Sequence, residues 1–533
     1  MTSNPPTHPD WYLGLDLGTS SCKCALIDTH GQLLAVVNQP YPDSESNPGW
    51  KTQGPEAVLE GLTRAVQRGT AKAGVDPARC AAASLGGALH SLVLLDREGR
   101  PLTPVSTWAD DRAAAQAEAV RQSGLGRELY QATGCPPHGM YPLYKLRWLH
   151  KHQPDLLQQA GHLVSAKEYV TARLTGRYLV DYSLASGSGL LNMHTLAWEP
   201  EALEAAGIPR DQLSELSGPR TRLHVTDRDF LDATGLPAGL TLVLGSSDAA
   251  NSNLGAGAVR PETATCMIGS SAAYRVLAPE PILPPEPSTW CYAVDRDHWL
   301  VGGALNSGGL AVSWLKELAA SLAEGETLSF NRLLKLAEAS PAGSRGLLFL
   351  PLLAGERSPG WNLQARGALV GLSLEHTLGD ITRAVLEGIA FRLRLIDELL
   401  SGLVGGSGGG PKGGPGGGSG GVPKGGITRV RASGGFTRSP FWIQLISDVL
   451  GRPLEVPRCG DTSALGAAYW ARIGAQGTQD LADAEEWPPV EAVYQPDPDL
   501  ASRYQELDQL SRELYRAAGP FSAQLAELRD QPG

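Results

Sequence analysis

The chain has 533 residues, a net charge of −11 and a pI of about 5.5, with 42% hydrophobic and 19% charged residues. This length exceeds what one hydrophobic core supports, so two or three domains are expected. The acidic balance and the lack of a long Lys/Arg run argue against a nucleic-acid-binding protein. No leader pattern and no apolar run of ~20 residues is present, which predicts a soluble, cytoplasmic protein. Seven scattered cysteines fit reduced thiols in that compartment.

The first part of the chain predicts a strand-rich opening. Residues 1–10 are polar and Pro-rich, and three short apolar runs follow at 12–16, 24–28 and 33–37. Glycines in the intervening turns favour a β-meander, which a Rossmann fold does not have. Residues 55–73 then carry apolar side chains at helical spacing.

A second strand-rich opening begins near residue 242, and an aspartate follows the first strand of each opening, at Asp16 and at Asp248. We therefore expect two domains of related architecture, at 11–246 and 247–500, and a helical tail at 501–533. The Gly/Pro/Ser-rich segment 402–426 is too poor in apolar residues to bury a core. It predicts a flexible surface insertion in the second domain.

The residues after the first strand suggest a phosphate-binding hairpin. Asp16 leaves a strand, Gly18 permits a tight turn, and hydroxyls and Lys23 follow. Backbone N–H groups and hydroxyls in such a turn can cradle phosphates. Asp16 could hold Mg²⁺ through water, because Mg²⁺ dehydrates reluctantly. An ordinary glycine-turned hairpin is the structural alternative.

Two later loops repeat this chemistry. Residues 268–273 combine a glycine with two serines, and residues 432–440 place paired glycines before the helical pattern of 442–450. Glycine lets a flat ligand approach the backbone closely, although a glycine turn before a helix N-cap would look the same. One loop is weak evidence, but one in each half suggests a nucleotide clamped between two domains.

Two longer motifs add a family resemblance. Residues 140–149 (MYPLYKLRWL) and residues 367–372 with 380–387 are similar to the two signatures of the FGGY family of carbohydrate kinases. Together with the three loops, the resemblance covers roughly residues 11–475. It implies an α/β fold of two actin-like (ribonuclease H-like) ATPase domains flanking a cleft. It also implies ATP-dependent phosphoryl transfer to a sugar hydroxyl with Mg²⁺.

The resemblance assigns roles residue by residue. Asp248 matches the catalytic base and Asp16 the metal-associated carboxylate, while Ser247 departs mildly from the family pattern. A carboxylate within hydrogen-bond reach of the hydroxyl can accept its proton. The positions that resemble the nucleotide-binding residues are Gly18, Thr19, Ser20, Lys23, Gly269, Ser270, Gly309, Gly434, Gly435 and Ser439.

Segments 87–91 and 107–112 are expected to face the sugar, with His90, Trp108, Asp110 and Asp248 as substrate residues. The residues of these two segments are more similar to those of gluconokinases than to those of xylulokinases, which implies phosphorylation of D-gluconate to 6-phosphogluconate. The gluconate carboxylate needs a cation, and the candidates are Arg112, Lys145 and Lys167.

Three alternatives stay open at this point. A xylulokinase or another ketose or polyol kinase belongs to the same class. A non-catalytic sugar-binding regulatory relative should have lost Asp16 or Asp248, and both are present. The chaperone or cytoskeletal branch of the actin-like fold lacks the motif at 140–149. The sequence leaves the acceptor sugar and the oligomeric state open, a homodimer included.

Overall fold

The computed structural model describes residues 11–41, 50–322, 328–405, 426–459, 461–478, 480–484 and 487–529. Most of the predicted insertion, residues 406–425, therefore lies outside the described residues, as do residues 1–10. None of the helices in these ranges combines the length and apolar character needed to cross a membrane. All seven cysteines are described, none of them is in a disulfide, and six of them are buried.

The chain forms two compact units. Unit 1 contains Met1–Arg260, Leu277–Val301 and Cys459–Pro488, and unit 2 contains the remaining segments, Pro261–Val276, Gly302–Arg458 and Pro489–Gly533. These units do not follow the expected division after residue 246. Unit 1 extends further, to Arg260, and it also includes a segment from the C-terminal part of the chain, Cys459–Pro488.

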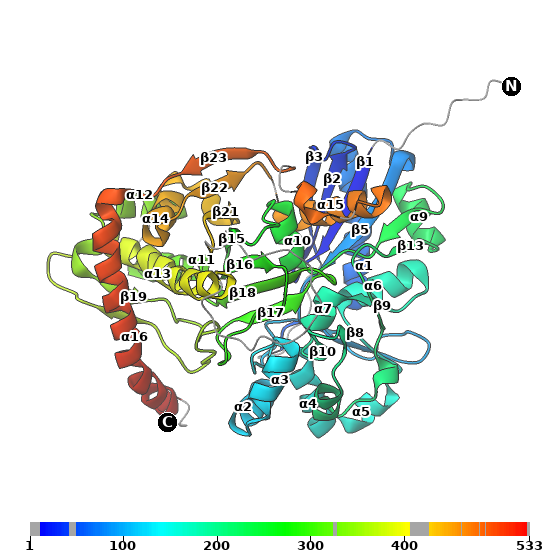
Figure 1. Ribbon diagram of the computed structural model, residues 1–533, viewed down its shortest axis with the longest axis horizontal. Helices are drawn as coiled ribbons and strands as arrows, with labels where there is room; N and C mark the ends of the chain where they lie inside the picture. Colours follow the sequence, from blue (N-terminus) through cyan, green and yellow to red (C-terminus); the bar gives the residue numbers. More distant parts are fainter. Residues whose placement is uncertain are drawn as a thin grey trace. The chain divides into compact units, whose positions relative to one another are not determined.

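A six-stranded mixed sheet forms the centre of unit 1 (Figure 1). Its order is β13 (Arg222–His224), β14 (Thr241–Val243), β5 (Cys80–Gly87), β1 (Trp11–Leu17), β2 (Ser21–Asp28) and β3 (Leu33–Pro40). The expected meander is confirmed, because β1, β2 and β3 pair antiparallel in succession. On its other side β1 pairs parallel with β5, which in turn pairs parallel with β14.

The second large sheet repeats this plan. Its order is β17 (Trp290–Ala293), β18 (Trp299–Leu305), β16 (Ala272–Ala278), β15 (Thr263–Ile268), β21 (Arg429–Ser433), β22 (Leu454–Pro457) and β23 (Val490–Tyr494). β15 pairs antiparallel with β16 and parallel with β21, and β21 pairs parallel with β22. In both sheets an antiparallel edge strand, β13 or β23, completes the parallel side. The two sheets thus share one pattern of antiparallel and parallel pairing around β1 and β15, as expected for actin-like domains, and the second sheet has one additional strand.

Helices and short strands complete the two units. The helices are α1 (Pro55–Ala73), α2 (Ala114–Gln122), α3 (Leu125–Thr133), α4 (Pro142–His152), α5 (Pro154–Gln159), α6 (Ala166–Thr175), α7 (Tyr182–Ser186), α8 (Pro200–Ala206), α9 (Arg228–Thr234), α10 (Asp248–Gly255), α11 (Gly309–Leu322), α12 (Phe330–Ala339), α13 (Leu378–Val404), α14 (Pro440–Leu450), α15 (Thr462–Gln476) and α16 (Ala501–Arg529). The short strands are β4 (Thr52–Gln53), β6 (Val93–Leu95), β7 (Val105–Ser106), β8 (His162–Val164), β9 (Leu179–Asp181), β10 (Leu191–Asn192), β11 (Ala197–Trp198), β12 (Glu215–Ser217), β19 (Leu348–Leu350) and β20 (Ala368–Val370). The helix predicted at 55–73 is therefore present as α1, and α16 accounts for the tail helix.

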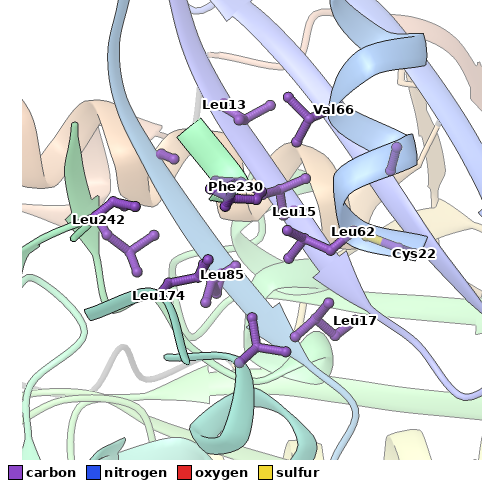
Figure 2. Packing of buried hydrophobic residues seen from close by; sticks show 14 of the residues in the cluster. Leu13, Leu15, Leu17, Cys22, Leu62, Val66, Leu85, Leu174, Phe230 and Leu242 are labelled. Atoms are coloured by element: carbon purple, nitrogen blue, oxygen red, sulfur yellow. The ribbon is translucent and has the colours of Figure 1, made fainter. Parts of the chain in front are cut away.

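The core of unit 1 lies between β1, β5 and the helices that cover them (Figure 2). Alternate residues of β1, such as Leu13 and Leu15, face α1, which supplies Leu62 and Val66. These side chains are essentially inaccessible to solvent. Each contributes about 1.5–3 kcal/mol of burial free energy, which fixes the strand that carries Asp16 next to its last residue.

Helix α15 explains why residues 459–488 belong to unit 1. It lies against β1 (Figure 1), where a Cβ on Gly14 would sit 2.2 Å from the backbone nitrogen of Ala468. It also crosses α10 closely, because Gly255 and Gly466 have no side chains at the crossing. A Cβ on either glycine would lie 1.9 Å from a carbonyl oxygen of the other helix segment. The sequence analysis did not predict that this C-terminal helix packs in unit 1.

Candidate active site

The turn between β1 and β2 is a tight hairpin fixed from two sides. The backbone nitrogen of Gly18 donates to the carbonyl oxygen of Ser21 at 3.0 Å. The side-chain amide of Gln53 donates to the carbonyl oxygen of Gly18 at 3.2 Å and to that of Thr19. Ser20 at the tip is exposed. The predicted phosphate loop is thus held by backbone contacts that leave its tip accessible.

Asp16 is the buried centre of a charge cluster in unit 1. Its Oδ2 accepts a hydrogen bond from the Ser463 hydroxyl and lies 3.7 Å from Lys23 Nζ, which lies 2.9 Å from Asp461 Oδ2. Burial raises the pKa of Asp16 to about 6; Lys23 opposes this, while Asp248 and Asp461 add to it. Carboxylates crowded in this way favour a bound cation.

The other oxygen of Asp16 fits the predicted magnesium site. Asp16 Oδ1 is buried and has no hydrogen-bond partner among the described residues. A buried acceptor of this kind costs free energy unless a ligand or water satisfies it. No group of three or more His, Cys, Asp or Glu side chains in the described ranges forms a ready metal cage. Mg²⁺ held by one or two carboxylates, phosphates and water needs no such cage.

Asp248 begins α10, at the point where the chain leaves β14. Gly245 has φ of +69°, and a Cβ there would lie 2.3 Å from the carbonyl oxygen of Leu85, so only glycine fits. Ser247 is the N-cap, and its hydroxyl accepts from the backbone of Ala250. The family departure at Ser247 is therefore compatible with the helix start. Asp248 is half-buried and close enough to Asp16 to influence its pKa.

The two predicted sugar-binding segments follow β5 and β7. His90 has φ of +69°, and its Nδ1 lies 2.6 Å from the carbonyl oxygen of Gly187. Trp108 is exposed. Asp110 is buried, and both of its oxygens accept hydrogen bonds from Arg112 at 2.6–3.1 Å. Asp110 in this structure thus fixes Arg112.

The Asp110–Arg112 pair borders a cavity of about 190 Å³. The Arg112 guanidinium lies 4.0 Å from the ring centre of Trp50 and 5.1 Å from that of Trp148. Such cation–π contacts stabilise the stacked position. Five leucines form much of the remaining wall, and Thr103, Ser106, Lys145 and Gln153 supply its other polar groups. Its lining residues include Leu92, Leu94, Leu102, Leu149 and Leu156.

The two lysines proposed as carboxylate partners have other contacts. Lys167 is 2% exposed, and its ammonium donates to Asp181 at 2.7 Å and to the carbonyl oxygen of Ser246. Lys145 is 6% exposed and donates to two backbone carbonyl oxygens. Burial lowers the pKa of Lys145 to about 7, against the opposing influence of nearby Asp110. Both ammonium groups are thus buried and donate to the protein, and Lys145 also lines the cavity beside Asp110 and Arg112.

In unit 2 the predicted nucleotide residues meet in one cavity of about 400 Å³. The first group comes from the β15–β16 turn, the second from the start of α11, and the third from the loop before α14. The predicted residues in its wall are Gly269, Ser270, Gly309, Gly435 and Ser439. Gly434, which directly precedes Gly435, has φ of +97°, a conformation that favours glycine. A Cβ on Gly269 or Gly435 would meet open space, so the cavity extends directly over both backbones.

The sequence prediction missed several residues of both sites. Phe330, Asn331 and Leu334 of α12 line the unit 2 cavity with Trp442. In unit 1 it missed Asp461, although an Asp before a helical apolar run is a recognisable N-cap signal. That signal locates the start of α15, but its contact with Lys23 appears only in the folded chain.

Comparison with known proteins shows to which family this chain belongs. The models of the FGGY family of carbohydrate kinases match residues 11–255 (N-terminal domain) and 264–475 (C-terminal domain). A gluconokinase of Bacillus subtilis (strain 168) is 32% identical over 480 residues, or 89% of either chain. Crystal structures of a gluconate kinase and of a ligand-bound xylulose kinase, both from Lactobacillus acidophilus, each give a TM-score of 0.87 at 30% identity, covering 97% of this chain and 99% of theirs. The chain therefore belongs to the FGGY family of carbohydrate kinases, which are ATP-dependent phosphotransferases that act on alcohol groups.

Proposed function

We propose that this protein transfers a phosphoryl group from ATP to the 6-hydroxyl of D-gluconate, giving 6-phosphogluconate. The observation that carries this proposal is the 32% identity to a gluconokinase across 89% of both chains. We also propose a cytoplasmic location, because seven cysteines without a disulfide suit a reducing compartment.

The residues of unit 1 suit proton transfer and charge stabilisation. Asp248 is half-buried at a helix start, so its carboxylate can accept the proton of the attacking hydroxyl. The hairpin of Gly18, Thr19 and Ser20 offers backbone N–H groups and hydroxyls to phosphate oxygens. Lys23 adds positive charge there and holds Asp16. We propose that Asp16 binds Mg²⁺ through water, and this ion would neutralise the charge that develops on the phosphates.

The residues of unit 2 suit nucleotide binding. Gly269 and Ser270 would meet the phosphates, and Gly309, Gly435 and Ser439 the nucleoside. The open space above Gly269 and Gly435 supports this assignment, because a ligand can approach the backbone directly. The aromatic walls of the cavity suit the faces of a purine ring.

Arg112 is the remaining candidate for the gluconate carboxylate. Its side chain is 19% exposed, and Asp110 and the two tryptophans already fix its orientation. A preorganised guanidinium loses little freedom when it binds a carboxylate. We therefore propose that Asp110 acts on the sugar acid through Arg112, with His90 and Trp108 contacting the hydroxyls and the apolar face.

A second candidate is phosphorylation of xylulose, because a xylulose kinase structure matches this chain as well as a gluconate kinase structure does. The deciding experiment is a kinase assay across gluconate, xylulose, ribulose, glycerol and erythritol. We expect gluconate to give the highest kcat/KM and phosphorus NMR to place the phosphate on C6. A clearly higher value for a neutral sugar would overturn the gluconate assignment and leave the family assignment intact. If no acceptor becomes phosphorylated, a non-catalytic binding role becomes the better interpretation.

A further inference from the structure

Helix α4 touches both segments that are proposed to bind the sugar. Its first turn carries Lys145, whose ammonium donates to the carbonyl oxygen of His90 at 2.7 Å and to that of Thr107 at 2.6 Å. His90 is itself a proposed sugar contact, and Thr107 directly precedes Trp108. One buried side chain thus connects two segments that are far apart in the sequence.

The contacts of α4 extend beyond this lysine. Tyr141, its N-cap residue, packs edge-on against the His90 ring with centroids 4.8 Å apart. One turn after Lys145, Trp148 lies beside the Arg112 guanidinium. The helix therefore borders both segments along one side, and Lys145 lies between these two contacts.

The backbone of His90 needs such a support. A non-glycine residue at φ of +69° lies in a region that costs free energy, and the surrounding contacts must hold it there. The Lys145 bond to the His90 carbonyl fixes the peptide plane on one side of the ring. The Nδ1 contact with the Gly187 carbonyl fixes the ring itself.

We propose that Lys145 is a positioning residue for the acceptor sugar, which fixes His90 and Trp108 through the His90 and Thr107 carbonyl groups. This inference rests on the proposed role of those two residues in sugar binding. The proposal concerns the two hydrogen bonds that its ammonium donates to the protein, and it assigns Lys145 no direct role with the sugar, although Lys145 also lines the cavity beside Asp110 and Arg112. The expected effect of its loss is on acceptor binding, while nucleotide binding in unit 2 stays unchanged.

The test compares Lys145→Met, which keeps the length and removes the donors, with Lys145→Gln, which keeps a neutral donor. Lys72→Met is a matched control, because Lys72 also donates to a backbone carbonyl, that of Val36 at 2.8 Å, but is exposed. Kinetics are measured with the sugar that the wild-type enzyme uses best, so that the result does not depend on gluconate. Hydrogen exchange of residues 88–91 and 107–112 is measured without any sugar.

We expect Lys145→Met to raise the acceptor KM about ten-fold or more, since two buried hydrogen bonds are lost. The ATP KM should stay within about two-fold, Lys145→Gln should be intermediate, and exchange should accelerate in both segments. If Lys145→Met does not fold, Lys145→Gln decides by the same two measurements. An acceptor KM within about two-fold of wild type, an equal rise of both KM values, or unchanged exchange would overturn the inference.

Discussion

Asp16 should cost the apoprotein stability at neutral pH, and Asp16→Asn should therefore stabilise it. Burial is the largest influence that raises the pKa of this carboxyl from 3.8 to about 6, and the nearby Asp248 and Asp461 add to it. A shift of about two pKa units corresponds to about 3 kcal/mol against the ionised form. Because the side chain is almost inaccessible, solvent screening reduces this figure little.

The pH dependence follows from the direction of this shift. Below pH 3.8 the carboxyl is protonated in both the folded and unfolded states, so it makes no difference to stability. Between pH 3.8 and about 6 the folded state binds more protons, so the free energy of unfolding falls as pH rises. Above about pH 6 the full cost is present. Asparagine cannot ionise, so Asp16→Asn removes the cost only at the higher pH values.

The assay is thermal unfolding from pH 4.5 to pH 8 with chelator present, so that no cation binds the carboxylate. We expect Asp16→Asn to melt a few degrees above wild type at pH 8 and to lose this advantage toward pH 4.5. The exposed Asp232 on α9 provides the control, and Asp232→Asn should change neither melting curve. The reasoning fails if Asp16→Asn melts below wild type at pH 8, or if its advantage is independent of pH.

Three further substitutions test the catalytic base, the nucleotide cavity and the packing. Asp248→Asn should lower kcat about 10²–10⁴-fold in steady-state assays and leave ADP affinity in calorimetry unchanged; more than about a third of wild-type kcat, with chemistry rate-limiting, would exclude Asp248 as the base. Gly435→Leu should melt like wild type, because its Cβ meets open space, yet raise the ATP KM about ten-fold or more by filling the cavity; an unchanged KM would place the nucleotide elsewhere. Gly466→Ala should destabilise by about 1–3 kcal/mol or more in chemical unfolding, because its Cβ would lie 1.9 Å from the carbonyl oxygen of Asn251; a neutral effect would show that α10 and α15 separate easily.

The parts of the site that the sequence predicted are those whose signals are local. The meander, the aspartate at the end of β1 and the glycine turns each occupy a few consecutive residues, and their patterns are specific. The glycines that line the cavity of unit 2 could be located in the same way, because they come from three such turns. The helix α12 that closes the cavity carries no comparable signal, since Phe330 and Asn331 look like ordinary residues at a helix start.

Contacts between distant segments could not be predicted from single-segment patterns. Ser463 donates to Asp16 across 447 residues of sequence, and nothing local to either residue indicates the partner. The surroundings of the two lysines are a related case. The sequence offered Lys145 and Lys167 as partners of a substrate carboxylate, and it carried no signal for the carbonyl and carboxylate oxygens that surround each of them in the fold.

The chemistry of Asp16 depends on residues that have no side chain. Gly14 lets α15 press against β1, and Gly255 and Gly466 let α10 cross α15, so that two helices reach the end of β1 together. A Cβ on Gly86 would lie 2.5 Å from the Asn251 side chain and 3.2 Å from Asp16 Oδ1. This close packing excludes water from Asp16 and brings Asp248 near it. The raised pKa of Asp16 is therefore a consequence of backbone packing, and the same packing prepares the carboxylate for a cation.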